Sequence, residues 1–391
     1  MSTIKEFISF AFSISMKKIQ MVDLGSQYQR IQQEIDQAVL EVIRSTAFIN
    51  GPAVKKFTEN LSQFLKVKHV IPCANGTDAL QIALMSLDLQ PGDEVITSDF
   101  TFISSAEVIA LLNLKPVLVD VLPDTFNINP EAIKKAITPR TKVIIPVHLY
   151  GQTADMDSIM NIAKEFNLSV IEDAAQSIGS QYFSNDGNTY FSGTMGHIGC
   201  TSFFPSKNLG AYGDGGAIFT NDDDLANKLS MIANHGMKIR YYHDLIGVNS
   251  RLDTLQAAIL DVKLKYLQDY NQRRNQAALY YDQKFLNHPL IITPYRDPKS
   301  THVFHQYTIK VPAEHRNSLQ KYLAEQEIPS MLYYPVPFHR QKAYQIYGYK
   351  EEDFPVSNHL AEIVLSLPMH SELTEDQLDY ITHHVIKYFQ S

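Results

Sequence analysis

Cysteine is scarce in this chain, which also lacks any block of basic residues and any long apolar run. Its two cysteines, Cys73 and Cys200, are too few for a disulfide framework or a metal-ligand cluster, so they favour a reducing, cytoplasmic setting and no bound metal. Because no apolar stretch reaches the length of a transmembrane helix, we expect no membrane partner. The net charge of −8 argues against nucleic acid as the main partner.

The apolar segment 7–14 (FISFAFSI) is too short to span a bilayer. It also lacks the longer basic lead and the small-residue cleavage site of a signal peptide. The sequence Met16-Lys17-Lys18 that follows looks like an alternative translation start. We therefore expect residues 1–15 to be an extension outside the fold.

With 391 residues, the chain exceeds the usual size of a single-core domain, so we expect one large and one smaller domain. Up to residue 220, short apolar stretches alternate with segments in which apolar residues recur at helical spacing. Seven of the apolar stretches are predicted strands: 67–72, 94–97, 116–120, 142–147, 168–173, 200–204 and 216–220. Strands separated by helices are typical of an α/β fold with a mostly parallel sheet and helices on both faces.

The pattern changes after the last of these strands. From Asp222 it is helical, with a long run from Leu252 into the 270s. From about residue 300 strand and helix patterns mix, and a terminal helix is predicted after Thr374. We expect a large domain over residues 16–260 and a smaller α+β domain over residues 261–391.

The stretch 200–220 (CTSFFPSKNLGAYGDGGAIFT) joins two predicted strands by a turn that contains Lys207. The glycines of this turn are Gly210, Gly213, Gly215 and Gly216. Such a density of glycine permits positive φ and close backbone approach. A lysine held at a rigid strand end, where desolvation favours loss of its proton, is suited to forming an imine with a carbonyl group. Taken alone, Lys207 is also compatible with a solvated turn.

Two further polar features are predicted at the carboxyl ends of strands, where parallel α/β sheets bind ligands. Asn75-Gly76-Thr77 opens a helix whose N–H groups, dipole and Thr77 hydroxyl suit a phosphate, although such a triplet is also an ordinary helix cap. Asp173 ends a strand, where its carboxylate either belongs to a site or caps the next helix. Together with Lys207, these are the parts that hold pyridoxal phosphate, because a carboxylate keeps the ring nitrogen protonated.

Eight motifs occur in order between residues 48 and 253, within a resemblance that runs from about residue 17 to the C-terminus. They are FINGP (48–52), ANGTDAL (74–80), DFTF (99–102), PVHLYG (146–151), EDAAQ (172–176), SFFPSKNLG (202–210), GDGG (213–216) and NSRLD (249–253). In this order they resemble the sugar-nucleotide aminotransferases of the DegT/DnrJ/EryC1/StrS family, which are pyridoxal-phosphate enzymes of fold type I. The resemblance implies a large domain with a mostly parallel seven-stranded sheet and a smaller C-terminal α+β domain.

The resemblance also implies roles around the cofactor ring. Lys207 would form the imine with the cofactor and Asp173 would pair with the ring nitrogen. Phe102 would stack on the ring face, and Gln176 would contact the side that carries the hydroxyl group. Simpler readings stay open for the last two, namely a core residue for Phe102 and a capping side chain for Gln176.

The implied phosphate ligands are Gly76, Thr77 and Ser202, joined by Asn249 from the other subunit. The role of Asn249 implies a homodimer with active sites shared between its subunits. The simpler alternative is that Asn249 caps a helix that begins near Leu252.

The implied reaction is a transamination in which glutamate is the amino donor, 2-oxoglutarate is released and a keto-sugar nucleotide is the acceptor. The motif spacing most resembles members that aminate a UDP-2-acetamido-3-keto-hexuronate for O-antigen or lipopolysaccharide assembly. A dTDP-3-keto-6-deoxyhexose or a 4-keto sugar nucleotide is the alternative substrate. A non-catalytic regulator or scaffold that binds pyridoxal phosphate is the alternative of another class.

Substrate contacts are the least specific part of the resemblance. The residues in stretches that shape the sugar-nucleotide pocket in the family include Arg251, His305, Tyr334 and His339. A cationic side chain, Arg251 or Arg340, is suited to pair bidentately with a diphosphate or a uronate carboxylate. Taken singly, each of these residues is more typical of a surface or packing position than of a ligand.

Overall fold

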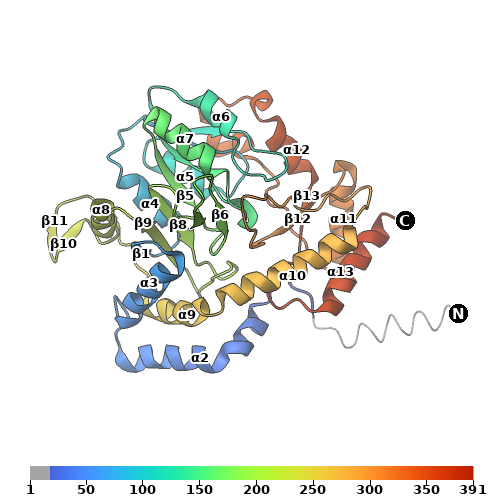
Figure 1. Ribbon diagram of the computed structural model, residues 1–391, viewed down its shortest axis with the longest axis horizontal. Coiled ribbons are helices and arrows are strands. Elements are labelled where there is room, and N and C mark those ends of the chain that lie inside the picture. The colour runs from blue at the N-terminus through green and yellow to red at the C-terminus, as the bar shows by residue number, and fades with distance from the viewer. Residues whose placement is uncertain (1–17, 391) are drawn as a thin grey trace.

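The computed structural model describes residues 18–390, so the predicted extension over residues 1–15 lies outside the described residues. At its centre is a seven-stranded sheet with the strand order β1-β9-β8-β5-β4-β2-β3 (Figure 1). Its strands are β1 His69–Cys73, β2 Glu94–Ser98, β3 Lys115–Val119, β4 Thr141–Ile145, β5 Ser169–Asp173, β8 Ile198–Ser202 and β9 Gly216–Thr220.

These are the seven strands that the sequence predicts, with ends that differ by no more than two residues. All run in one direction except β9, which pairs antiparallel with both β1 and β8. The predicted α/β fold with a mostly parallel sheet is therefore confirmed.

Helices cover both faces of the sheet because side chains alternate along each strand. In β5, Ile171 packs with α4 (Gly76–Met85), α5 (Ser104–Leu111) and α8 (Asp223–Ala233). Its neighbour Val170 packs with α6 (Pro130–Ala136) and α7 (Met156–Phe166) on the opposite face. Beside β8 and β9 this second face is covered by α3 (Pro52–Leu65) and α9 (Thr254–Leu264).

A second hydrophobic core lies at the far end of the long helix α10 (Leu267–Phe285), which leaves α9 and runs to the right in Figure 1. Its other elements are β12 (Tyr307–Lys310), α11 (Ala313–Glu325), β13 (Val364–Leu367) and α13 (Glu375–Tyr388). β12 and β13 form an antiparallel pair. Ile19 also packs in this core, so both ends of the described chain meet there.

The predicted domain boundary after residue 260 falls inside α9. Leu260 and Leu264 both pack in the core against the large sheet, whereas Ala277 and Phe285 belong to the second core. We therefore propose that α10 is the connection between the two domains. Helix α12 (Pro355–Ile363) then returns to the large domain, where Leu360 packs in one cluster with the segments that follow β2 and β4.

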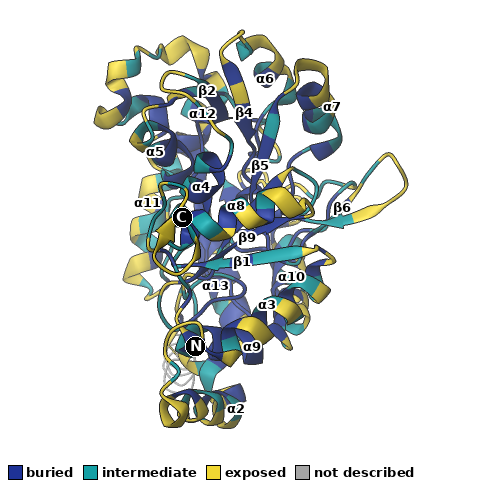
Figure 2. Cartoon of the chain, turned by 90° about the vertical axis from the view of Figure 1, so that its left-hand side faces the viewer, coloured by how far each residue is buried: buried dark blue, intermediate teal, exposed yellow. Residues whose placement is uncertain are grey.

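Three peripheral elements have no counterpart in the sequence prediction. They are α2 (Leu24–Ser45), the hairpin β6–β7 (Gln181–Phe183 and Thr189–Phe191) and the hairpin β10–β11 (Met237–Ile239 and Tyr242–His243). Figure 2 shows exposed residues concentrated on α2 and on the hairpin that contains β6, around a buried sheet. Among the described residues no helix is both long enough and apolar enough to cross a membrane.

Candidate active site

Lys207 lies just beyond the carboxyl end of β8, in a tight turn that glycine makes possible. The backbone N–H of Lys207 donates to the carbonyl of Phe204 at 2.8 Å. A Cβ atom on Gly210 would stand 2.2 Å from the carbonyl oxygen of Pro205, so this position excludes any side chain. Burial lowers the pKa of Lys207 to about 8, and the nearby Asp173 carboxylate opposes that shift. The amine is therefore available in its neutral form close to physiological pH.

Asp173 ends β5 on the same edge of the sheet and is 6% exposed. Its carboxylate accepts hydrogen bonds from the hydroxyl of Ser105 at 2.9 Å and from the N–H of Ala175 at 3.1 Å. Its backbone carbonyl accepts from the N–H of His148 at 3.0 Å. These contacts fix the position of the Asp173 carboxylate at the edge of the sheet.

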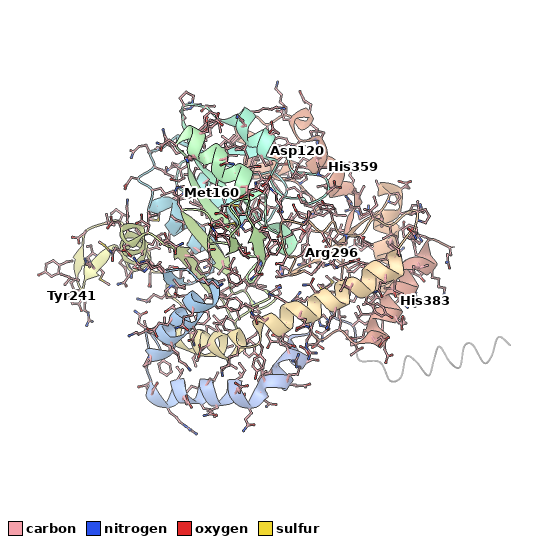
Figure 3. The ribbon with its side chains drawn as sticks, in the orientation of Figure 1. Asp120, Met160, Tyr241, Arg296, His359 and His383 are labelled. Carbon is pink, nitrogen blue, oxygen red and sulfur yellow. The ribbon has the colours of Figure 1, made fainter. Side chains whose placement is uncertain are left out.

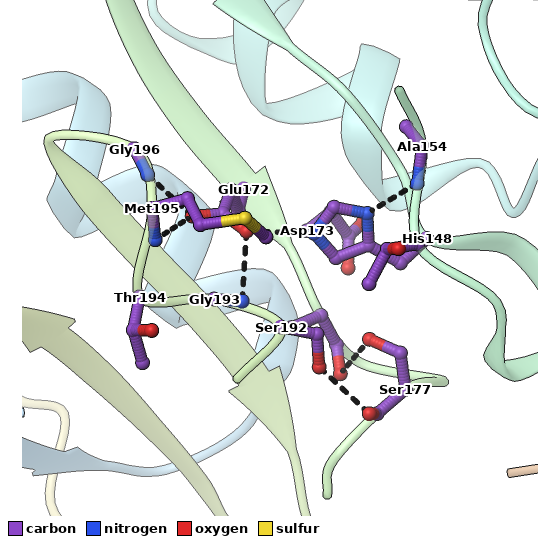
Figure 4. Close-up of polar contacts among 12 residues, drawn as sticks. His148, Ala154, Glu172, Asp173, Ser177, Ser192, Gly193, Thr194, Met195 and Gly196 are labelled. Carbon is purple, nitrogen blue, oxygen red and sulfur yellow. Dashed lines mark hydrogen bonds and ion pairs between the residues drawn. The ribbon is translucent and has the colours of Figure 1, made fainter. Parts of the chain in front are cut away.

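The preceding residue, Glu172, anchors the end of β5 through contacts with His148 and with the loop that contains Gly193 and Met195 (Figure 4). Its fully buried carboxylate accepts from the backbone N–H groups of Gly193, at 2.8 Å, and Met195, at 2.6 Å. The ring Nε2 of His148 donates to the same carboxylate at 2.8 Å. The other ring nitrogen of His148 accepts from the N–H of Ala154 at 3.1 Å, which assigns the proton to Nε2. Both oxygens of the Glu172 carboxylate therefore accept hydrogen bonds, and these hold the end of the strand that carries Asp173.

The N-terminus of α4 meets β8 beside Lys207. Asn75 caps this helix, because its side chain accepts from the N–H of Asp78 at 2.8 Å. A Cβ atom on Gly76 would lie 2.7 Å from the Cβ of Ser202, so only glycine allows the helix start to approach the end of β8 this closely. The hydroxyls of Thr77 and Ser104 lie 2.8 Å apart. A helix N-terminus lined by hydroxyl groups is a favourable place for a phosphate.

Aromatic and amide groups border the space next to Asp173. Gln176 is held by the N–H of Tyr150, which donates to its Oε1 at 2.8 Å, and its Nε2 donates to the Tyr334 hydroxyl at 3.1 Å. The ring of Phe102 lies 6.3 Å from that of Tyr334 and is 54% exposed. The ring of Phe102 is therefore accessible, and the alternative that Phe102 is a core residue is wrong.

His305 is buried, and its Nδ1 has no hydrogen-bond partner among the described residues. Burial lowers the pKa of its imidazole well below the usual value, and the charges of Lys207 and Arg274 add to this. A neutral ring near Lys207 with a vacant nitrogen is suited to a hydrogen bond with a ligand.

Asn249 and Arg251 do not contact Lys207. Asn249 is exposed and does not cap the following helix, because the N-cap of α9 is Asp253. Arg251 lines a separate cavity of about 660 Å³ with Asn50, the hairpin residues Lys238 and Arg240, and others. The alternative role of Asn249 as a helix cap is therefore wrong.

His339 is placed differently from the sequence interpretation. Its Nδ1 contacts the Asp99 carboxylate at 2.7 Å and its Nε2 contacts Glu351 at 3.1 Å, so both ring nitrogens are engaged. Arg340 donates from Nε to the same Glu351 at 2.8 Å. These side chains join the end of β2 to the C-terminal segment, and we do not carry His339 or Arg340 into the proposed substrate site.

Sequence reasoning missed the residues that hold the site residues in place, namely Ser104, Ser105, His148 and the carboxylate of Glu172. One signal was available for the serines, because they begin a predicted helix directly after the DFTF motif. The backbone N–H partners of Glu172 lie in a loop more than twenty residues further on, with no periodic pattern to mark it.

Comparison with known proteins shows the family to which the chain is related. A model of the DegT/DnrJ/EryC1/StrS aminotransferase family matches residues 29–386. The chain is 47% identical to a pleiotropic regulatory protein of Geobacillus stearothermophilus, over 95% of this chain and 99% of that protein. It is 46% identical to the UDP-2-acetamido-2-deoxy-3-oxo-D-glucuronate aminotransferase of Pseudomonas aeruginosa, over 91% of this chain and 96% of the relative.

A third relative is the dTDP-3-amino-3,6-dideoxy-α-D-galactopyranose transaminase of Aneurinibacillus thermoaerophilus, 42% identical over 95% of this chain and 99% of that protein. Among solved structures, Bacillus subtilis NtdA with bound cofactor PMP superimposes with a TM-score of 0.88 at 32% identity, covering 96% of this chain and 86% of NtdA.

Proposed function

This chain belongs to the DegT/DnrJ/EryC1/StrS aminotransferase family and is a sugar aminotransferase that depends on pyridoxal phosphate, and we propose that it aminates UDP-2-acetamido-3-keto-hexuronate with glutamate as donor. Amino transfer rests on one observation: Lys207, Asp173 and the start of α4 occupy the same edge of the sheet. The choice of substrate rests on similarity to the Pseudomonas aeruginosa enzyme.

The residues at this edge fit pyridoxal phosphate. Gly76 leaves the helix start open beside Ser202, where a side chain would fill the phosphate position. The buried Asp173 carboxylate offers a negative charge to a protonated ring nitrogen, and Phe102 exposes an aromatic face beside it. We propose that Gly76, Thr77 and Ser202 hold the phosphate group, and that Gln176 contacts the ring on its hydroxyl side.

The bound cofactor supplies an electron sink, which stabilises negative charge on the carbon that loses a proton. Asp173 keeps a negative charge at the ring nitrogen. The Nζ of Lys207 removes the proton from the α-carbon of glutamate. In the second half of the reaction it delivers a proton to the sugar carbon that receives the amino group. A pKa of about 8 suits both tasks, because neither protonation state is strongly disfavoured.

Two residues near Lys207 are proposed contacts for the sugar. His305 offers its unpartnered Nδ1, and Tyr334 presents a hydroxyl that already accepts from Gln176 and has a proton left to donate. Arg251 is the proposed partner of the uronate carboxylate. The other candidate, Arg340, is already paired with Glu351.

We further propose a homodimer in which Asn249 and Arg251 act in the site of the other subunit. Arg251 lines a cavity with residues of the hairpin β10–β11, and Asn249 bridges to Asn234, which precedes the hairpin. The hairpin projects from the body of the chain (Figure 1), with Tyr241 at its tip (Figure 3). Tyr241 is 76% exposed and Ile239 of β10 is 66% exposed. Apolar side chains presented on a projecting arm are typical of a surface that a partner covers.

Mixing two inactive variants tests the shared site. Lys207→Ala and Asn249→Ala subunits should each be defective alone, but a hybrid dimer contains one site with neither defect. Mixed and reassociated protein should therefore recover activity that neither variant has. Full activity of a sedimenting monomer under assay conditions would refute the shared site.

A coupled assay with glutamate and three acceptors tests the substrate. We expect the UDP-3-keto-uronate to have the largest kcat/KM, because losing a buried charged hydrogen bond costs about 2–5 kcal/mol. A dTDP-3-keto-6-deoxyhexose should therefore react at least tens of times more slowly, and a UDP-4-keto-hexose should also be a poor acceptor. If either is the better substrate, the uronate assignment fails while amino transfer stands.

The same assay separates an enzyme from a regulator. The similarity to the Geobacillus stearothermophilus regulatory protein favours a regulator. A regulator, however, would have no use for the proton-transfer group of Lys207. Cofactor binding without turnover of any acceptor would support the regulator. With turnover, we assign the enzyme to O-antigen or lipopolysaccharide assembly in the cytoplasm.

A further inference from the structure

A second lysine, Lys263, is buried close to the turn that carries Lys207, and the proposed reaction gives it no task. It lies near the C-terminal end of α9 and is 1% exposed. Its Nζ donates to the carbonyl oxygen of Gly210, three residues beyond Lys207. Its other close neighbour is the ring of Tyr212, with Nζ 5.1 Å from the ring centre. Both contacts are to the glycine-rich turn.

Burying a lysine is unfavourable unless its amine has specific partners. Burial lowers the pKa of Lys263 to about 7, and the charge of Arg274 contributes to this. In its neutral form the amine still has N–H groups to donate, so the bond to Gly210 does not require a charge. Among the described residues, Lys263 contacts a backbone carbonyl and an aromatic ring, and no carboxylate pairs with it. The contacts of Lys263 therefore hold the glycine-rich turn and do not form an ion pair.

After Lys207, side chains from α9 and α10 hold the turn on both sides of Gly210. Before Gly210, Asn208 donates from Nδ2 to Asn271 of α10 at 2.7 Å and to the carbonyl of Val303 at 2.9 Å. After Gly210, the N–H of Tyr212 donates to Gln256 of α9 at 2.8 Å. Lys263 holds the carbonyl between these two points.

Gly210 itself has little freedom. A Cβ atom there would collide with the carbonyl of Pro205, which means that the two sides of the turn are in contact across Lys207. The neighbouring Ala211 donates to the carbonyl of Phe203 at 2.7 Å and closes the turn onto the end of β8. A movement of the Gly210 carbonyl is therefore transmitted directly to the backbone at Lys207.

We propose that Lys263 is a positioning residue for Lys207, which it aims at the cofactor by holding the Gly210 carbonyl. The proposal rests on the proposed function, because it assumes that Lys207 forms the imine. It predicts that the distance and direction of the Lys207 amine depend on a hydrogen bond made outside the site. Misplacement of a reacting group by about 1 Å can cost about 100-fold in rate.

The test compares Lys263→Met and Lys263→Arg with wild type. Methionine keeps the length of the side chain and removes the donor, whereas arginine keeps a donor. Lys284→Met is the matched control, because it removes a lysine that pairs with Asp379 on the surface of the second domain. Apo protein is mixed with pyridoxal phosphate, and the appearance of the lysine-bound absorption band is followed at several pH values.

For Lys263→Met we expect imine formation and kcat to fall about 10- to 100-fold, with an unchanged KM for glutamate and a shifted pH midpoint of the band. Lys263→Arg should recover most of the rate, and Lys284→Met should match wild type. A lower unfolding temperature with unchanged rates and midpoint would make Lys263 merely structural and overturn the proposal.

Gln256→Ala provides a second route if Lys263→Met does not fold, because it loosens the same turn at Tyr212. The same slowing of imine formation is expected there, and normal rates would also overturn the proposal. Absence of the band in wild-type protein would instead refute the role of Lys207 in the proposed function. The two failures are therefore distinguishable.

Discussion

Replacing Lys207 by alanine should abolish the visible absorption of the lysine-bound cofactor and reduce turnover to background. Loss of the proton carrier alone accounts for about 10²–10⁴-fold, and loss of the imine adds to that. The variant should still fold, because it removes a partly buried amine whose pKa shift shows that burial disfavours its charge. Turnover and absorption are measured on the same preparation, with unfolding temperature as the check on folding.

The matched control is Lys207→Arg, which keeps a long cationic side chain but does not form an imine. Both variants should retain the phosphate contacts at α4 and so still bind the cofactor without a covalent bond. Either variant with normal transamination would remove Lys207 from the mechanism.

Asp173→Asn should give the second largest loss. The amide has almost the same shape and still accepts from Ser105 or Ala175, but it no longer carries the charge that keeps the ring nitrogen protonated. Removing one preorganised electrostatic group of this kind typically costs about 10²–10³-fold in kcat. The half-reaction with glutamate, followed by absorbance after rapid mixing, measures the effect without the sugar substrate.

The same variant should change the titration of Lys207 in the apo protein. Burial lowers the pKa of Lys207 to about 8, and Asp173 opposes that shift by favouring the charged amine. Without the carboxylate the pKa falls further, so imine formation should reach its maximal rate at lower pH in Asp173→Asn than in wild type. A midpoint that moves upward, or a kcat within a few-fold of wild type, would contradict the assigned position of Asp173.

Ser105→Ala is a milder substitution than Asp173→Asn, because it removes one hydrogen bond to Asp173 and leaves the charge of the carboxylate. A smaller loss than for Asp173→Asn is expected, because the Ala175 N–H and the backbone contact to His148 still hold the strand end.

The strands of the large sheet can be predicted from the sequence because each is marked by a local pattern of residues. A buried parallel strand is a short apolar run between turn residues, and the stretch 168–173 is recognisable as such before its neighbours are known. The hairpin β10–β11 has no such signal. Its residues Ile239, Tyr241 and Tyr242 are exposed, so no burial pattern marks their pairing.

The proposed connection through α10 is also beyond what a local pattern can indicate. A helical pattern from Leu252 into the 270s shows where helix occurs, but not that Leu264 faces one core and Phe285 another. Only the packing partners, which are distant in sequence, separate the two.

In the candidate site, too, some residues can be predicted from the sequence and others cannot. Lys207 and Asp173 stand at strand ends next to unusual residue patterns, and topology alone brings such ends together. The supporting contacts of Glu172, Ser105 and Lys263 come from loops and helices whose mutual placement follows from the folded chain. No spacing in the sequence relates Lys263 to Gly210.

Reduction of the protein with borohydride, followed by peptide mass analysis, tests the central claim most directly, because it converts an imine into a stable bond to the lysine that formed it. Two buried lysines have a lowered pKa, about 8 for Lys207 and about 7 for Lys263. The site geometry predicts that the cofactor is attached to the peptide that contains Lys207 and to no other. Attachment to Lys263, or protein that carries cofactor without any reducible bond, would contradict it.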